Sequence, residues 1–226
     1  MFVSARVFNL NFSAPRENGI KAAKEALQAG RAVVFPTDTS YAIAVNGLDE
    51  KAVQLLWSIK KQENKTPLTI FIANISLLNK IASGISDDLK TKLLHFWPGS
   101  LTFILKGLNN LVWNKEITPN VVSVRMPLHP VAHEIMGLDL VLATSSPNKA
   151  GLLMGKNISE IKEQFGNEIA VYLDAGELTA ATPSSILDLT TELPVLVRAG
   201  SVTLEDIASV ITNVVTDIPD LAGNEK

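Results

Sequence analysis

The stretch RAVVFPTDTSY, residues 31–41, joins a short apolar run to a cluster of hydroxyl and carboxylate side chains. Its β-branched residues predict a strand over 31–35, and Pro36 stops regular pairing because it lacks a backbone N–H. The preceding segment, 18–28, carries apolar residues at helical spacing and ends at Gly30, a common helix C-terminus. Helix, strand and polar loop therefore form the first unit of an α/β fold.

The same alternation continues along the chain. Asp49 is expected to cap a second helix, which leads into the polar segment 60–66. Its expected core-facing residues are Ala52, Leu55, Leu56 and Ile59. Further helices are expected near 86–95, 130–136 and 158–165, and from Thr203, where Thr203-x-x-Asp206 resembles a capping box. The expected strands are 68–73, 101–106, 121–125, 140–144, 169–174, 185–189 and 195–198.

Composition limits the class of protein. The 226 residues include no cysteine, which excludes disulfides and thiolate chemistry. A hydrophobic content of 46% makes disorder implausible, and no Pro/Gly/Ser-rich linker divides the chain. No apolar run approaches the roughly 18 residues that cross a bilayer, so we expect a cytoplasmic protein with no membrane partner. The net charge of -3 argues against a protein that mainly coats nucleic acid.

Hydroxyl-rich segments follow three of the predicted strands: 36–41, 145–151 and 183–185. In open α/β sheets, ligands bind in the crevice outside strand ends, where hydroxyls and free N–H groups converge on anionic oxygens. The alternative is that these are turn residues that satisfy their own backbone. For any single segment the alternative is the stronger interpretation, but three such segments together favour a binding site.

Four cations complete an anion-binding pattern. Lys60 and Lys61 leave a helix, while Arg125 and Arg198 each end a predicted strand. A guanidinium in a buried strand needs a planar anionic partner, and carboxylate or phosphate fits best. The alternative for the arginines is an ion pair inside the protein, and the candidate partners are Asp38, Asp174 and Asp188. For the lysines, the alternative is a favourable interaction with the helix dipole at the end of the helix.

Other catalytic signatures are weak or missing. The sequence has no Walker A loop, dinucleotide fingerprint or nucleophile elbow. His129 and His133 are spaced like a metal pair beside Glu134, but Pro130 takes His129 out of helical geometry and no third ligand is evident. We therefore predict no metal held by protein side chains. The segment 95–99 is expected to be a helix end packed by aromatics and turned by Pro-Gly.

Seven segments, in this order, resemble the YrdC/Sua5 family, whose members make threonylcarbamoyl-AMP for N6-threonylcarbamoyladenosine in tRNA. They are 35–41, Lys60 with Pro67-Leu68, 97–102, 124–127, 144–151, 183–188 and 198–200. The resemblance implies a single α/β domain over residues 1–217, with an open twisted mixed sheet, helices on its faces and a concave cavity. Residues 218–226 would form a C-terminal tail, and the extra domain of the longer Sua5 branch is missing.

The resemblance also implies a reaction and a set of substrates. The family joins L-threonine, bicarbonate and ATP with Mg2+, forming L-threonylcarbamoyladenylate and releasing pyrophosphate. Contact with tRNA or double-stranded RNA and downstream threonylcarbamoyl-transfer proteins are the other implied partners. By the resemblance, threonine or its carbamate would be held by Thr39, Arg125, Ser145 and Ser184. The nucleotide would be held by Lys60, Gln62, Thr66, Ser146, Asn148 and Arg198, with Lys60, Arg125 and Arg198 taking the catalytic roles.

Several positions depart from the family pattern. Gln62 stands where the family usually has arginine, and Phe71 stands where many members have histidine. One alternative is therefore a non-catalytic paralogue that binds nucleotide or RNA in the same cavity. Another is a related adenylate-forming enzyme with a different amine substrate.

Overall fold

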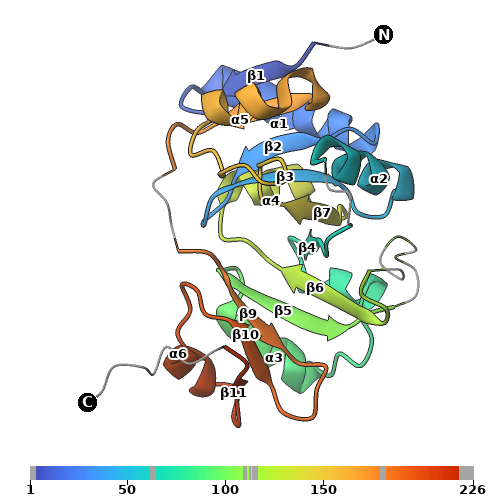
Figure 1. Cartoon of the computed structure of the whole chain (residues 1–226), viewed down its shortest axis with the longest axis vertical. Helices are drawn as coiled ribbons and strands as arrows, with labels where there is room; N and C mark the ends of the chain where they lie inside the picture. Colours follow the sequence, from blue (N-terminus) through green and yellow to red (C-terminus); the bar gives the residue numbers. More distant parts are fainter. Residues whose placement is uncertain are drawn as a thin grey trace.

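One mixed β-sheet runs the length of the molecule (Figure 1). The computed structural model describes residues 4–61, 65–108, 111, 113, 117–178 and 182–218. In spatial order its eleven strands are β1 (Arg6–Asn9), β8 (Val171–Asp174), β2 (Val33–Pro36), β3 (Tyr41–Asn46), β7 (Leu142–Ser145), β4 (Thr69–Phe71), β6 (Val121–Arg125), β5 (Leu101–Lys106), β9 (Ser185–Asp188), β10 (Val195–Arg198) and β11 (Val215–Thr216).

The sheet is open, with β1 and β11 at its two edges. Parallel pairs join β1 to β8, β8 to β2, β4 to β6, β5 to β9 and β10 to β11, and the remaining pairs are antiparallel. This mixed pairing brings strands that are distant in sequence next to each other. As a result, the polar segments at their ends come from widely separated parts of the chain.

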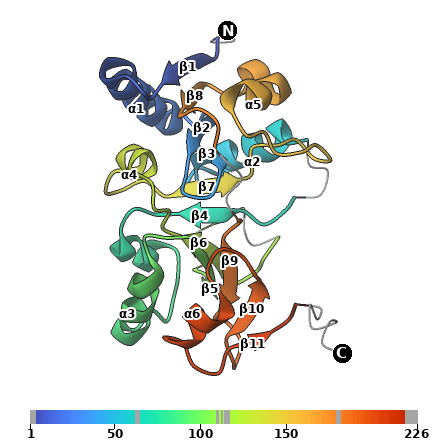
Figure 2. The ribbon, with the colours of Figure 1, turned by 90° about the vertical axis from the view of Figure 1, so that its left-hand side faces the viewer.

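Helices cover both faces of the sheet (Figure 2). In the upper half of that view, α1 (Ser13–Gln28) and α4 (Pro130–Met136) lie on one side, and α2 (Glu50–Ile59) and α5 (Ile158–Phe165) on the other. The remaining helical segments are η1 (Ile75–Lys80), α3 (Asp87–Phe96), η3 (Gly166–Glu168) and α6 (Leu204–Ala208). None of the described helices is both long and apolar enough to cross a membrane.

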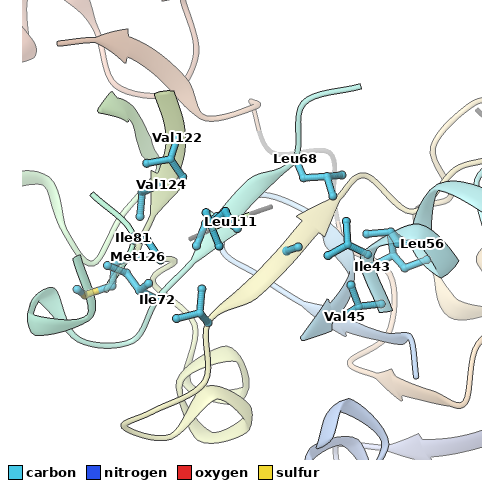
Figure 3. Close-up of a cluster of buried hydrophobic side chains, with 14 of the residues drawn as sticks. Ile43, Val45, Leu56, Leu68, Ile72, Ile81, Leu111, Val122, Val124 and Met126 are labelled. Carbon is cyan, nitrogen blue, oxygen red and sulfur yellow. The ribbon is translucent and has the colours of Figure 1, made fainter. Parts of the chain in front are cut away.

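Strand β3 separates two hydrophobic cores. Ile43 and Val45 face the core that α2 covers, whereas Ala42 and Ala44 face the core beneath α1 and α4. Figure 3 shows Ile43 beside Leu56 of α2, within the larger core. Because both faces of β3 are buried, its sequence lacks the polar alternation by which half-exposed strands are recognised.

Side-chain caps start most of the helices. Asp49 accepts hydrogen bonds from the backbone N–H groups of Lys51 and Ala52, which fixes the start of α2. Ser86 and Asn157 cap α3 and α5 in the same way. The predicted box at the start of α6 is also confirmed, because Thr203 and Asp206 bond each other's backbone N–H groups reciprocally.

The predicted helices and strands are largely confirmed, but several differ. Helix α1 begins at Ser13, earlier than expected, and the sequence analysis missed β1, β3, η1 and β11. The prediction that Leu55 faces the core is wrong, since it is 39% exposed while Val53 and Trp57 are buried in its place. Residues 219–226 of the expected tail lie outside the described part of the chain, so the boundary at 217 stays a prediction.

A close backbone approach shapes the end of β10. A Cβ atom on Gly200 would lie 2.2 Å from the carbonyl oxygen of Pro183 and 2.5 Å from the backbone nitrogen of Ser185. The chain after Arg198 therefore packs directly on the segment that leads into β9, and only glycine permits this contact. This contact sets the relative positions of Arg198 and Ser184.

We expect Gly200→Ala to lower the free energy of unfolding by about 1–3 kcal/mol, because overpacking here displaces backbone rather than a flexible side chain. Urea denaturation measures the change. Gly84→Ala is the control, since its Cβ meets no atom within 4 Å and only its φ of +70° is strained, at about 1 kcal/mol. A Gly200 variant no less stable than the Gly84 variant would contradict the packing argument.

Candidate functional site

A cavity of about 310 Å³ lies where the ends of several central strands meet. Its walls include the loop between β2 and β3, residues of β3, β4, β5, β6 and β7, the segment before β9 and the last residue of β10. The sequence analysis expected three hydroxyl-rich segments to converge, and the structure brings parts of all three to this cavity. The cavity residues from these segments are Thr37, Thr39, Ser40, Tyr41, Ser145, Ser146, Pro183 and Ser184.

The loop between β2 and β3 combines turn chemistry with an open hydroxyl group. Thr37 Oγ1 donates to the carbonyl of Ser40 at 2.6 Å and accepts from the backbone N–H of Thr39 at 3.2 Å. The alternative prediction of a self-satisfied turn is therefore correct for Thr37. These bonds hold Thr39 at the cavity wall, where its Oγ1 accepts a hydrogen bond from Arg125.

Arg125 is the buried cation of the cavity, at 3% exposure. Its guanidinium donates to Gly99 O at 2.9 Å, to Thr39 Oγ1 at 3.0 Å and to Asp38 Oδ2 at 2.7 Å. Burial lowers the pKa of Arg125, and Asp38 opposes this shift, so the guanidinium remains charged. The sequence analysis left open an ion pair inside the protein or a binding role; Arg125 forms the ion pair with Asp38 and also lines the cavity.

Arg198 is the exposed cation at the rim of the cavity. It donates to Ser184 O and to Ser184 Oγ, each at 2.9 Å. Partial burial lowers its pKa, and among the described residues no carboxylate forms an ion pair with it. Neither Asp174 nor Asp188 is its partner. Its charge is therefore available to an anionic ligand at the cavity mouth.

Lys60 lies outside the cavity lining and is almost fully buried, at 1% exposure. Its ammonium donates to the carbonyls of Ser146 and Asn148 at 2.6 and 2.8 Å, and its own carbonyl accepts from Ala150 N–H. Burial lowers the pKa of Lys60 to about 8. Through these hydrogen bonds, Lys60 connects the loop after β7 to the end of α2.

The other predicted nucleotide-binding residues lie at different distances from the cavity. Ser146 lines it, as does Ser145, which was predicted to hold threonine or its carbamate. Ser146 Oγ donates to Asn148 Oδ1 at 2.6 Å. Asn148 and Thr66 are not among the lining residues, although Asn148 braces the loop by donating to Leu152 O. Gln62 lies outside the described residues.

The sequence analysis assigned no role to several residues of the cavity wall. The Tyr41 hydroxyl donates to Gly176 O at 2.7 Å, and burial raises its pKa to about 12. The hydroxyl is therefore neutral and links β3 to the segment after β8. Thr102 Oγ1 lies 3.1 Å from Ser184 Oγ, and Phe71 forms the wall beside Arg125. Phe71 and Thr102 lie within strands, where no sequence signal distinguishes a wall residue from a core residue.

The acidic and histidine residues offer no metal site in the described ranges. His133 Nε2 is bonded to the carbonyl of Pro127 at 2.7 Å, and Glu134 pairs with Arg16. The polar side chains that line the cavity carry hydroxyls and two guanidiniums, a set that suits anions better than cations.

Comparison with known proteins shows the family of this chain. Residues 25–200 match the Sua5_yciO_yrdC family, whose description reads "Telomere recombination". A protein of Mycobacterium tuberculosis is 34% identical over 196 residues, which are 87% of this chain and 90% of that protein. The threonylcarbamoyl-AMP synthase of Pyrococcus abyssi is 33% identical over 200 residues, which are 85% of this chain and 57% of that protein.

Solved structures show the same fold. The crystal structure of P. abyssi Sua5 complexed with L-threonine matches with a TM-score of 0.85 and 31% identity, over 98% of this chain. The present chain spans 65% of the length of that structure. Escherichia coli YciO matches with a TM-score of 0.75 and 23% identity over 90% of this chain, a likeness of fold.

The buried amine of Lys60 leads to a prediction about pH. Because the folded pKa, about 8, is below the ordinary 10.5, the unfolded chain binds more protons between these pH values. Lys60 therefore makes the free energy of unfolding rise with pH across this window, by up to about 3 kcal/mol. Urea denaturation of the native chain and Lys60→Met at several pH values isolates this contribution. Parallel curves for the two proteins would contradict it.

Proposed function

Because this chain belongs to the Sua5/YciO/YrdC family, we propose that it is a nucleotidyltransferase that makes L-threonylcarbamoyladenylate. The substrates would be L-threonine, bicarbonate and ATP, and the products would be the adenylate and pyrophosphate. The observation that carries the proposal is the pair of arginines at two depths of one hydroxyl-lined cavity. A buried guanidinium suits a small carboxylate, and a guanidinium at the rim suits a polyphosphate.

The proposed reaction has two bond-forming steps. The amine nitrogen of threonine attacks the carbon of bicarbonate, and water leaves as the carbamate forms. A carbamate oxygen then attacks the α-phosphorus of ATP, and pyrophosphate leaves. In-line transfer of this kind depends on positioning and on neutralising charge, so it needs no protein nucleophile. This agrees with a cavity lined by hydroxyls and guanidiniums.

The residues of the chain divide these tasks by position. We assign Arg125 and Thr39 to the threonine carboxylate, with Ser145 and Ser184 nearby for the amino acid or its carbamate. We assign Arg198 to the phosphates, because its charge is unpaired among the described residues and lies at the mouth. Lys60 supports this end indirectly, by holding the loop that presents Ser146.

Mg2+ would enter as part of the ATP substrate. Magnesium keeps several waters and binds one or two carboxylates together with substrate phosphates. Asp38 lies between the cavity-lining residues Thr37 and Thr39 in sequence, and its two oxygens already accept from Arg125 and from the backbone N–H of Leu128. The ion would therefore be held chiefly by the triphosphate, whose charge it shares with Arg198.

Pyrophosphate release tests the proposal. With ATP and Mg2+ present, we expect release that requires both L-threonine and bicarbonate. Gln62→Arg, measured in parallel, shows whether the missing arginine limits the rate. If only the Gln62 variant reacts, the native chain is a binding paralogue of the family. RNA affinity that falls steeply with salt and ignores threonine would support that alternative.

We expect Arg198→Ala to lower pyrophosphate release by about a hundredfold or more, because a charge-assisted contact to the transferring phosphates is lost. The protein should stay folded, since Arg198 is exposed and forms no ion pair with a described residue. Arg6→Ala is the matched control, because it removes an exposed arginine from the edge strand β1. Equal activity of the two variants would remove Arg198 from the proposed site.

A further inference from the structure

Asp38 lies behind the cavity wall rather than in it. Its neighbours Thr37 and Thr39 line the cavity, but Asp38 itself does not, and its side chain is 15% exposed. Both carboxylate oxygens have partners: Oδ2 accepts from Arg125 Nη2 at 2.7 Å, and Oδ1 accepts from the backbone N–H of Leu128 at 3.1 Å. The carboxylate thus links the loop between β2 and β3 to the segment that leads into α4.

The bonds of Arg125 fix which of its donors stay available. A guanidinium carries five N–H groups. Nε donates to Gly99 O, one N–H of Nη1 to Thr39, and one N–H of Nη2 to Asp38. Within the described ranges, one N–H on each terminal nitrogen is left. Each of them can donate a charge-assisted hydrogen bond to an oxygen of a ligand carboxylate.

The Phe71 ring lies beside the same guanidinium. The Cζ atom of Arg125 lies 5.7 Å from the centre of the Phe71 ring, within the range of a cation–π contact. Phe71 is 5% exposed and belongs to β4, which pairs with β6 directly opposite Arg125. A ring can limit tilting of the guanidinium, but it supplies no bond that fixes rotation within the guanidinium plane. The edge contacts, including the charged one from Asp38, must do that.

We propose that Asp38 is a positioning residue for the amino-acid substrate, which turns the two remaining N–H groups of Arg125 toward the substrate carboxylate. The inference rests on the proposed function for the identity of that substrate. Asp38 also offsets the positive charge of the buried guanidinium, which leaves Arg198 as the net charge of the cavity. Asp38 therefore acts on binding of the amino acid, through Arg125, whereas Arg198 supplies the positive charge for the phosphates.

Asp38→Asn is the sharpest test, because it keeps the size of the side chain and an acceptor for Leu128 N–H. The substitution removes the negative charge. It also places the amide NH2 group of the new side chain opposite Nη2 of Arg125, so that two donors face each other. We expect the KM for L-threonine to rise by about tenfold or more, with the KM for ATP changed by less than about twofold. Asp188→Asn is the matched control, since that carboxylate bonds only Thr190 in its own turn among the described residues.

Nitrogen-15 NMR of the Arg125 side chain gives a readout that does not depend on turnover. We expect slow rotation of the guanidinium in the native protein and in Asp188→Asn, and faster rotation in Asp38→Asn. Unchanged rotation together with an unchanged threonine KM would overturn the inference. A loss of thermal stability with equal changes in both KM values would also overturn it, because Asp38 would then be merely structural.

The same experiments separate this inference from the proposed function. If the native protein neither binds nor uses L-threonine while Asp38→Asn frees the guanidinium, the substrate assignment fails and the positioning of Arg125 stands. If the native protein uses L-threonine and Asp38→Asn matches it in KM and in guanidinium rotation, the function stands and the positioning role fails.

Discussion

The buried guanidinium of Arg125 is the constraint on which the rest of the site depends. It connects the end of β6 to the loop after β2 through Asp38 and Thr39, and to the segment before β5 through Gly99. A charge at 3% exposure is costly unless it is paired and hydrogen-bonded, so these three segments must meet at one point. The cavity is formed where they meet.

This arrangement divides the electrostatics of the cavity by depth. At the inner end, Asp38 balances the charge of Arg125, so the guanidinium contributes directional hydrogen-bond donors more than net charge. At the rim, Arg198 keeps a charge that no described carboxylate balances, while Gly200 and Ser184 set its position. In the proposed reaction, a small zwitterion would occupy the first environment and a magnesium-bound triphosphate the second. The proposed reaction needs both, side by side.

The sequence was enough to predict most of the secondary structure and the convergence of the hydroxyl-rich segments. It missed β3 because a strand that is buried on both faces shows no alternation of apolar and polar residues. It misplaced Leu55 because helical spacing predicts which side of a helix faces the core but not how far that side extends around the helix. It also could not show that the ammonium of Lys60 bonds the backbone carbonyls of Ser146 and Asn148. Contacts between a side chain and a distant backbone leave no pattern in the sequence. The same holds for Phe71 and Thr102, which reach the cavity only through the strand order.

Incorporation of labelled bicarbonate tests the central claim most directly. The purified protein is incubated with carbon-13 bicarbonate, L-threonine, ATP and Mg2+, and the nucleotide products are analysed by mass spectrometry. Our account predicts a product that contains threonine and AMP joined through a single labelled carbon. An unlabelled threonyl adenylate, or intact ATP as the sole nucleotide recovered, would contradict it.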